Sequence, residues 1–226
     1  MPMYLCRAVL HENLYYATRE IGRLYETERC LHNYALTYAL GFATSSYFQA
    51  QQIPHYVADL TPLNERGIYV TAARGLDVRY SIHTLKYANN LYHVDMEKSR
   101  RNTPTFGRAK EVTVGSIFEF VVLSEREKLR LPRWIRLGIW RSKTSLSWQE
   151  CENPARRAGA FTAVLPLNPL DVLGQMLAFD LLSMPPVSLV QNVHMEGEYY
   201  ELPDGLCLPV GMKFFHLAPR DRATQR

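Results

Sequence analysis

The amino-acid sequence predicts an α+β fold in which helices cover one face of an antiparallel sheet. Three observations predict this class. Met3–Leu10 is rich in β-forming residues and predicts a central first strand. Apolar residues then recur at helical spacing through residues 31–42. Near the end of the chain, a Pro-Asp-Gly turn at residues 203–205 separates two predicted strands, 187–202 and 206–215.

The other predicted elements complete a familiar order. We expect strands at residues 68–72, 79–87 and 112–123, and a second amphipathic helix at residues 170–182. The order strand, helix, strands, helix, strands resembles βαββαβ with additions, a ferredoxin-like and RRM-like arrangement. The sequence contains no RNP1 pattern, which excludes a conventional RRM that binds RNA on its sheet face. We expect residues 1–226 to form one domain.

The segment between the first strand and the first helix is expected to bind phosphate. Thr27 is predicted to cap this helix, and Gly41 is predicted to end it. Arg19 and Arg23 flank Gly22 just before the predicted cap, so guanidinium groups and free helix N–H groups would share one edge. The alternative is a structural salt-bridge cluster, because three acidic residues are close in sequence: Glu20, Glu26 and Glu28.

Basic residues are concentrated in two runs, although the formal net charge is only +4. Residues 98–110 contain five basic residues and no acidic one, and residues 126–143 contain seven against one. The first run belongs to a longer excursion between two predicted strands, residues 89–110, which predicts a protruding hairpin or a mobile loop. Such a run can be a solvated face, but two in one chain favour a nucleic-acid partner.

Aromatic residues are interleaved with both basic runs. Single-stranded RNA is bound by stacking bases on rings while cations follow the phosphates, so this pattern favours RNA. The alternative is that the rings pack in the core or within hairpins, and we favour it for the tryptophans. The rings concerned are Tyr80, Tyr87, Tyr92 and Phe106 at the first run, and Trp134, Trp140 and Trp148 at the second.

Motifs of common enzymes are missing from the sequence. There is no GxxxxGK[ST], GxGxxG, HExxH or GxSxG, and no carboxylate pair or cysteine spacing indicates a metal, so we expect no cofactor. One catalytic alternative stays open. His32 with Tyr34, or His83 and His93 near Lys86, could form the acid–base group of a metal-independent ribonuclease. A histidine near an aromatic residue on a helix is more often a packed core residue.

The cysteines and the polarity of the chain predict a cytoplasmic protein. The four cysteines are scattered, which fits free thiols in a reducing compartment. Residues 30–58 carry no Asp, Glu, Lys or Arg, but they are too polar for a membrane span. The N-terminus lacks the pattern of a secretion signal.

Three stretches carry a resemblance to a known family. Residues 10–40, the ERGIYVTAA run that begins at Glu65, and the ELPDG turn followed by LCLPVG resemble the Cas-five-like (Csc-one) family of type I-D CRISPR effector complexes. This family belongs to the RAMP superfamily of RNA-binding proteins. The resemblance implies a RAMP-type domain with a thumb-like β-hairpin, which here would be residues 89–110. It also implies a non-catalytic subunit, because type I-D systems use a separate processing nuclease.

The resemblance further implies what the chain binds. The subunit would cap the backbone filament, hold the 5′ repeat-derived handle of the CRISPR RNA, and contact the large subunit that reads the PAM. Its partners would be CRISPR RNA, the backbone (Cas-seven-like) subunit and the large subunit, with target DNA met indirectly. Exposed apolar surface would pack on the two protein partners. Two rivals stay open: an endoribonuclease that processes precursor CRISPR RNA, and a scaffold whose basic runs meet acidic proteins.

The expected RNA-binding residues fall into three groups. One group would hold the handle backbone, a second would form the thumb, and a third surrounds Gly138, the nearest match to the glycine-rich loop of RAMP proteins. In that order the groups are Arg19, Arg23 and Thr27; Lys98, Arg100, Arg101, Arg108 and Lys110; and Arg136, Arg141, Ser142 and Lys143.

Overall fold

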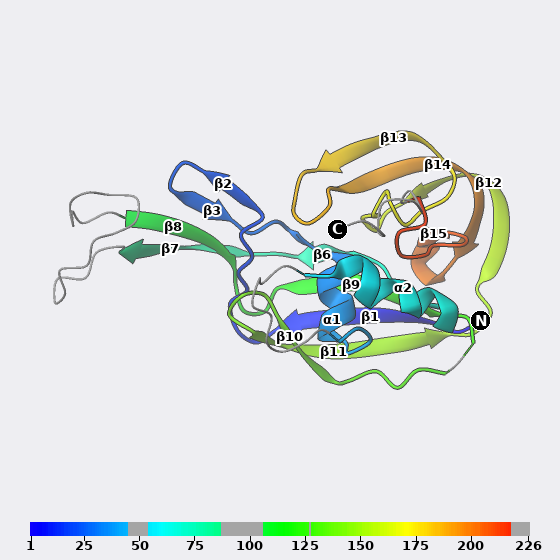
Figure 1. The fold of residues 1–226 in the computed structure, drawn as a ribbon, viewed down its shortest axis with the longest axis horizontal. Helices are drawn as coiled ribbons and strands as arrows, with labels where there is room; N and C mark the ends of the chain where they lie inside the picture. Colours follow the sequence, from blue (N-terminus) through cyan, green and yellow to red (C-terminus); the bar gives the residue numbers. More distant parts are fainter. Residues whose placement is uncertain (45–53, 87–105, 127, 218–226) are drawn as a thin grey trace.

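The computed structural model describes residues 1–44, 54–86, 106–126 and 128–217 (Figure 1). Within these residues the chain is mostly antiparallel sheet with two short α-helices. The strands form one seven-stranded sheet and two four-stranded sheets. Neither described helix is long and apolar enough to cross a membrane.

The seven-stranded sheet is built around the first strand, as the sequence predicts. β1 (Met3–Leu10) pairs antiparallel with β9 (Ile117–Ser124) on one side and with β11 (Ser142–Cys151) on the other. The strand order is β10-β11-β1-β9-β6-β4, and β5 also pairs with β9. The outer strands are β10 (Trp134–Leu137), β6 (Ala73–Asp77), β4 (Cys30–Leu31) and β5 (Ile68–Val70).

One face of this sheet packs against the first helix, α1 (Asn33–Ala39). Tyr4, Cys6 and Ala8 alternate along β1 and are buried together with Leu36 of α1. This alternation is the period of two that a strand with one buried face requires. The predicted helix is therefore confirmed, although it is only seven residues long. Gly41 follows it with φ 78°, and its N–H donates to Tyr38 O at 3.0 Å, as expected of a helix-ending glycine.

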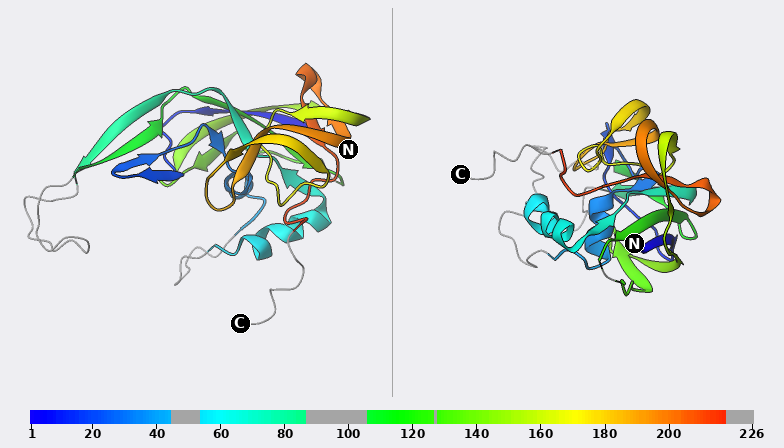
Figure 2. Two further views of the ribbon diagram at one scale, coloured as in Figure 1. Left: turned by 90° about the horizontal axis from the view of Figure 1, so that it is seen from above. Right: turned by 90° about the vertical axis from the view of Figure 1, so that its right-hand side faces the viewer.

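The C-terminal part of the chain forms a second sheet over the first (Figure 1, Figure 2). Its strand order is β12-β14-β13, with β15 also paired to β14. Buried residues of this sheet share one hydrophobic cluster with Met3 and Leu123 of the seven-stranded sheet. The predicted turn at residues 203–205 is observed as a short 3₁₀ turn. The strands are β12 (Ala155–Ala163), β13 (Gln175–Leu182), β14 (Leu189–Glu201) and β15 (Cys207–Pro209).

The predicted helix at residues 170–182 is wrong. Gly174 has φ 123°, which a helix cannot accommodate, and the chain from Gln175 onwards is the strand β13. Leu177, Phe179 and Leu181 recur with a period of two, which fits a strand as well as a short stretch of helical spacing does. Pairing with β14 decides between the two.

A helix that the sequence analysis did not predict lies between α1 and β5. α2 (Tyr56–Arg66) contains Pro62 in its interior, where a proline argues against a helix. It ends at Gly67, which has φ 67° and donates its N–H to Asn64 O at 3.2 Å. Leu60 and Leu63 bury its apolar side in the cluster shared by the two sheets.

The third sheet projects from the body of the molecule, and we call it the arm (Figure 1). Its strand order is β2-β3-β8-β7, with β3 and β8 parallel and the other pairs antiparallel. Of the predicted thumb at residues 89–110, residues 89–105 lie outside the described part of the chain, and the rest belongs to β8. The strands are β2 (Arg19–Ile21), β3 (Leu24–Glu26), β7 (Tyr80–Lys86) and β8 (Phe106–Val112).

Candidate nucleic-acid interface

The loop between β10 and β11 is held in place by Gly138. This residue has φ 74°, and a side chain there would place its Cβ 2.7 Å from the carbonyl oxygen of Tyr15. The Ile139 N–H donates to that same oxygen at 3.0 Å, and Arg141 N donates to Gly138 O at 3.1 Å. The loop therefore packs against residue 15 and exposes Trp140 and Arg141.

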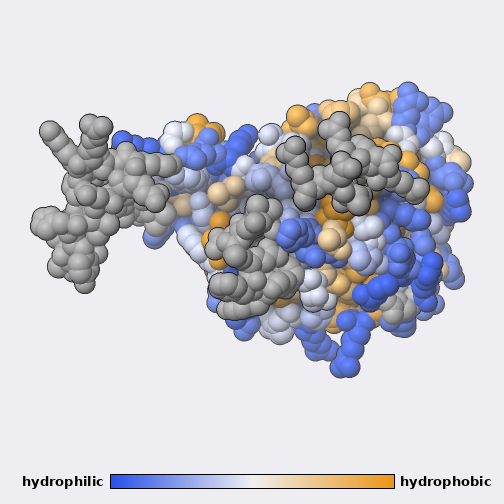
Figure 3. Space-filling model, viewed as in Figure 1, coloured by the Kyte–Doolittle hydropathy of each residue, from blue (hydrophilic) through white to orange (hydrophobic). Residues whose placement is uncertain are grey.

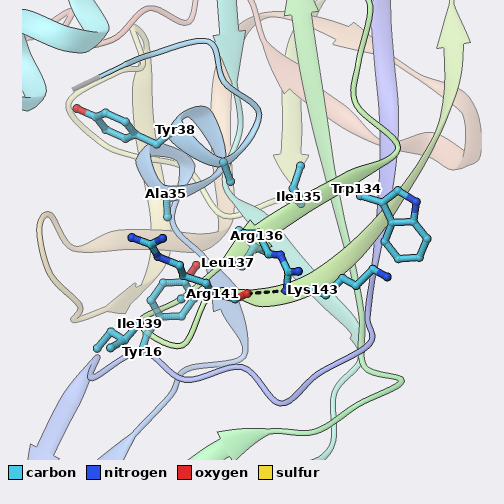
Figure 4. Close-up of a pocket in the computed structure, with 12 residues that line it drawn as sticks. Tyr16, Ala35, Tyr38, Trp134, Ile135, Arg136, Leu137, Ile139, Arg141 and Lys143 are labelled. Carbon is cyan, nitrogen blue, oxygen red and sulfur yellow. Dashed lines mark hydrogen bonds between the residues drawn. The ribbon is translucent and has the colours of Figure 1, made fainter. Parts of the chain in front are cut away.

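Alternation along this hairpin gathers cationic and aromatic side chains on its outer face. Ile135 and Leu137 are buried, while Trp134 and Arg136 are exposed. Lys143 is the Cα partner of Arg136 across the hairpin, and its Nζ lies 4.4 Å from the centre of the Trp134 ring. Figure 4 shows Arg141, Arg136, Lys143 and Trp134 following one another along the hairpin.

Glu12, two residues after the end of β1, binds one of these side chains and the backbone that carries another. Its Oε2 accepts from Arg136 Nη1 at 3.1 Å and from Lys143 N at 2.6 Å. Arg136 Nη1 also donates to Arg141 O at 3.1 Å. Within the described residues, no carboxylate pairs with Arg141 or Lys143. The hairpin thus offers one oriented guanidinium and two cations that carry uncompensated charge.

Two open hollows border these cations. One has a volume of about 860 Å³ and the other about 900 Å³, and Arg136 and Arg141 line both. Trp134 is 49% exposed and Trp140 is 45% exposed, so both rings can be reached from solvent. We call this surface the hairpin groove; its lining includes Tyr16, Tyr38, Trp134, Arg136, Ile139, Trp140, Arg141 and Lys143. Exposed rings beside cations are able to bind stacked bases and phosphates together.

Ser142 plays a supporting part. The residue is buried, and its hydroxyl donates to the carbonyl oxygen of Asn13. Asn13 is in turn held by Glu111, whose Oε2 accepts from Asn13 Nδ2 at 3.1 Å. Neither Glu12 nor Asn13 was singled out in the sequence analysis. The run of three polar residues at positions 11–13, directly after an apolar strand, is a sequence signal that could have found them.

The prediction that Thr27 caps the first helix is wrong. Thr27 is buried, its hydroxyl donates to Tyr16 O at 2.9 Å, and it accepts from Tyr16 N at 3.1 Å. The helix begins later, at Asn33, and its N-cap is His32, which accepts from Tyr34 N at 3.2 Å. The sequence contains a Thr-Glu pair typical of a helix start, but these two bonds to residue 16 hold Thr27 in an extended segment.

Arg19 and Arg23 consequently lie on the arm and not at a helix N-terminus. They belong to the β2–β3 hairpin, whose turn contains Gly22 with φ 62°. Arg19 pairs with Glu26 at 2.8 Å and with Glu28 at 3.6 Å, so the salt-bridge alternative holds for this residue. Arg23 is exposed in the turn.

The described thumb residues also lie on the arm. Lys110 of β8 is 3.4 Å from Glu26 and 4.4 Å from the centre of the Tyr80 ring. Partial burial opposes ionisation of Glu26, but hydrogen bonds and charge from Arg19 and Lys110 lower its pKa overall. Arg108 is exposed on the same strand. The other three predicted thumb residues, Lys98, Arg100 and Arg101, lie outside the described part of the chain.

The structure gives His32 a structural task. The residue is buried, its Nδ1 caps α1, and its Nε2 lies 3.1 Å from Val187 O. Burial lowers its pKa to about 4, so the ring is neutral at physiological pH. His83 is exposed on β7, and His93 lies outside the described residues.

Metal-binding and disulfide chemistry find no support in the described part of the chain. No group of three or more His, Cys, Asp or Glu side chains there could hold a metal ion. The four cysteines are free thiols. Burial raises the pKa of Cys30 to about 12, which keeps this thiol protonated.

The fold places the chain among mostly antiparallel α+β proteins with few helices. The family model described as "Type I-D CRISPR-associated protein Cas5/Csc1" matches residues 1–217, and the chain belongs to this family. The resemblance inferred from the sequence is therefore confirmed. No curated protein matches the chain.

Two solved structures show similarity at low sequence identity. A chain in the cryo-EM structure of the Type III-B Cmr-beta bound to cognate target RNA and AMPPnP has a TM-score of 0.47 and 8% identity, covering 85% of this chain and 86% of that one. A crystal structure of a CRISPR protein from Archaeoglobus fulgidus has a TM-score of 0.44 and 12% identity, with 92% and 98% covered.

Proposed function

We propose that the chain is a non-catalytic subunit of a cytoplasmic type I-D CRISPR interference complex. It binds the 5′ handle of the CRISPR RNA along the hairpin groove and caps the backbone filament next to the large subunit. Membership of the Cas5/Csc1 family supports the complex. The observation that supports the RNA site is the row of Arg141, Arg136 and Lys143 beside two exposed tryptophans on one hairpin.

Both ionic contacts with phosphates and stacking with bases would contribute to RNA binding. Glu12 and Arg141 O both accept from Arg136 Nη1, so a phosphate would meet the other edge of this oriented guanidinium, whose charge Glu12 compensates in part. Arg141 and Lys143 have no carboxylate partner among the described residues, so their charge is available to neighbouring phosphates. Trp134 and Trp140 offer faces on which bases can stack.

The arm would contribute a second contact. We propose that it acts as the RAMP thumb, on a ferredoxin-like core, and that Arg23, Arg108 and Lys110 meet the RNA backbone. The other predicted thumb residues, Lys98, Arg100 and Arg101, lie outside the described residues. Arg19 is the weakest member of this group, because its charge is compensated by Glu26 and Glu28.

Protein partners would use a different surface. Leu177, Phe179 and Leu181 of β13 are each at least half exposed. Figure 3 shows hydrophobic residues along the upper edge of the body, where β13 lies in the same view of Figure 1. In Figures 1 and 2, β13 lies on the side opposite to the β10–β11 hairpin. We propose that β13 packs on the backbone (Cas-seven-like) or the large subunit, and that target DNA is met only through that assembly.

A charge-matched pair of variants tests the RNA site. Arg141→Gln with Lys143→Gln removes two positive charges from the hairpin groove. Arg156→Gln with Arg157→Gln removes two from β12, where both arginines already pair with glutamates. We expect the groove variant to bind a synthetic handle RNA at least tenfold more weakly. Its log K against log salt slope should fall by about 1.4, because each single-strand phosphate contact contributes about 0.7. The β12 variant should match the unmodified protein in both quantities.

The contrary result is equally specific. Unchanged affinity in the groove variant would remove the hairpin from the RNA site. An equal loss in both variants would show that binding follows net charge and not position.

A separate assay tests the absence of catalysis. Purified protein incubated with repeat RNA and without metal should leave the RNA intact, because His32 caps a helix and its pKa is too low for it to act as an acid at pH 7. A single cut at the handle boundary, lost in His32→Ala or His83→Ala, would establish the ribonuclease instead.

A further inference from the structure

A second and more enclosed pocket adjoins the hairpin groove. It has a volume of about 310 Å³, within the size range of small-molecule sites. Tyr16, Ala35, Tyr38 and Ile139 line both this pocket and the larger hollow of the groove. The two spaces therefore meet along a common wall. We call the smaller space the inner pocket.

Fixed aromatic rings form part of the inner pocket. The Tyr38 hydroxyl donates to Asp59 Oδ2 at 2.6 Å, which orients its ring. The rings of Tyr38 and Tyr56 have centres 6.2 Å apart, and those of Tyr34 and Tyr56 are 5.2 Å apart. Met184, Pro185 and Pro186 complete much of the lining. The surface is aromatic in part and mostly apolar.

The described residues that line the inner pocket carry no charge at neutral pH. Its one titratable histidine is His32, whose ring nitrogens are both occupied by protein partners. A phosphate or an ionised side chain would lose its hydration there without gaining an oppositely charged partner among the described lining residues. The suitable occupant is an uncharged, flat group that can stack on tyrosine.

We propose that the inner pocket takes one unstacked base of the RNA strand whose phosphates lie along Arg136 and Arg141. This assignment rests on the proposed function of the hairpin groove. Ile139 belongs to the wall shared by the two spaces and is two residues from Arg141, so a strand that contacts this arginine passes the pocket entrance. Splaying a base out of the strand and stacking it on aromatic rings is a general way in which proteins bind single-stranded RNA.

An abasic scan locates the base. Each nucleotide of a synthetic handle RNA is replaced in turn by an abasic sugar, and the affinity for the full chain is measured. We expect one position to weaken binding about fivefold or more, the lower end of what base–aromatic stacking contributes, since 1.4 kcal/mol is tenfold. A scan in which no position differs from its neighbours by more than twofold would overturn the proposal.

A variant that fills the pocket assigns the effect to this place. Ala17 is exposed and lines the inner pocket, so Ala17→Trp puts a ring into the space without removing a core residue. This variant should bind intact RNA more weakly by the same factor, and the abasic position should no longer matter. Ala158→Trp, at an exposed position on β12, is the matched control and should behave like the unmodified protein.

A second variant covers the case in which Ala17→Trp does not fold. Tyr38→Leu removes one ring and keeps an apolar side chain, so sensitivity to the abasic position should shrink by several fold. Abasic sensitivity that persists in Ala17→Trp and in Tyr38→Leu would place the base elsewhere and overturn the proposal. If Ala17→Trp binds RNA normally but blocks assembly with the other subunits, the occupant is a protein side chain and the proposal is also wrong.

The proposal for the hairpin groove and the proposal for the inner pocket can be refuted independently of each other. Loss of RNA binding in the Arg141 and Lys143 variant, together with a flat abasic scan, would leave the proposed function intact and remove only the inner pocket. Affinity that is unchanged in the Arg141 and Lys143 variant would remove the groove itself.

Discussion

At the scale of single residues, Gly138 determines the shape of the candidate site. Two separate obstacles oppose any other residue there: the positive φ, and the distance of only 2.7 Å that a Cβ would have from the Tyr15 carbonyl oxygen. The sequence indicated the residue through its position between cationic neighbours. It could not indicate the close approach, because Tyr15 comes from a segment more than a hundred positions away.

A pair of glycine variants separates those two obstacles. Gly138→Ala should lower the free energy of unfolding by about 1–3 kcal/mol and weaken RNA binding, because the loop must move away from Tyr15. Gly115→Ala is the control, since Gly115 has φ 83° but open space around its missing side chain. Urea unfolding of both variants measures the difference. Equal destabilisation of the two variants would show that the steric clash between an added Cβ and the Tyr15 carbonyl oxygen contributes nothing.

Two buried titratable residues have opposite effects on stability in the same pH range. Burial lowers the pKa of His32 to about 4, from 6.5 when unfolded, so the unfolded chain binds more protons and stability rises from pH 4 to pH 6.5. Burial raises the pKa of Asp171 from 3.8 to about 6, despite hydrogen bonds from Phe215 N, Asn33 and Tyr69. The folded chain then binds more protons between those values, so this residue makes stability fall as pH rises.

Variants of these two residues should therefore change the pH dependence in opposite directions. His32→Asn keeps a side chain able to cap α1 and should flatten the rise in stability between pH 4 and 6.5. Asp171→Asn removes the opposing contribution and should steepen that rise. The measurement is urea unfolding at intervals of pH, each variant compared with the unmodified protein. Slopes that change in the same direction would contradict the assignment.

At the scale of elements, the first strand, the first helix and the long strand β14 could be predicted, whereas β13 and α2 could not. β1 is apolar on one face, and α1 has several apolar residues at helical spacing, so both signals were local. Residues 170–182 were assigned to the wrong element and α2 was missed, for two different reasons. In residues 170–182, a short apolar stretch fits the period of a helix as well as that of a strand. In α2, Pro62 argues against a helix, and the packing of Leu60 and Leu63 in the core stabilises the helix nonetheless.

The same limit applies to the candidate site. Arg136, Arg141 and Lys143 were identified from charge and from the nearby glycine, and the structure places them together on one hairpin. Thr27 and Arg19 were assigned to a helix start because the β2–β3 hairpin has no apolar alternation that would reveal it. Glu12, Tyr16 and Tyr38 reach the groove only through tertiary packing.

The exposed face of β13 yields a prediction at this scale. Phe179→Lys should change the free energy of unfolding by no more than about 0.5 kcal/mol, because the side chain is half exposed and lies outside the core. It should reduce assembly with the backbone and large subunits, measured by co-purification. RNA binding by the isolated chain should be unaffected. Normal assembly would show that β13 is not a protein contact.

At the scale of the whole molecule, charge is distributed unevenly. On the second sheet, Arg156 and Arg157 are compensated by Glu198 and Glu201 across the β12–β14 pair. On the β10–β11 hairpin, Arg141 and Lys143 lack such partners among the described residues. The net charge of +4 therefore does not reveal that positive charge is concentrated on the β10–β11 hairpin. The local charge, and not the net charge, attracts a polyanion to a particular surface.

Because charge is distributed unevenly, two opposite sides of the molecule would bind different partners. The hairpin groove and the arm would meet RNA, and the apolar margin of β13, on the other side of the body, would meet protein (Figure 1). The hydrophobic cores of the two sides meet at β1: Met3 belongs to the cluster that contains Met195 of β14, and Tyr4 belongs to the cluster that contains Ile135 of β10.

The most direct measurement is photo-crosslinking of the handle within the assembled type I-D complex. Handle RNA that carries 4-thiouridine is irradiated in the complex, and the crosslinked peptides are identified by mass spectrometry. We expect peptides that contain residues 134–143 of this chain. Crosslinks confined to other subunits, or to β12–β15 of this chain, would contradict the placement of the RNA on the hairpin groove.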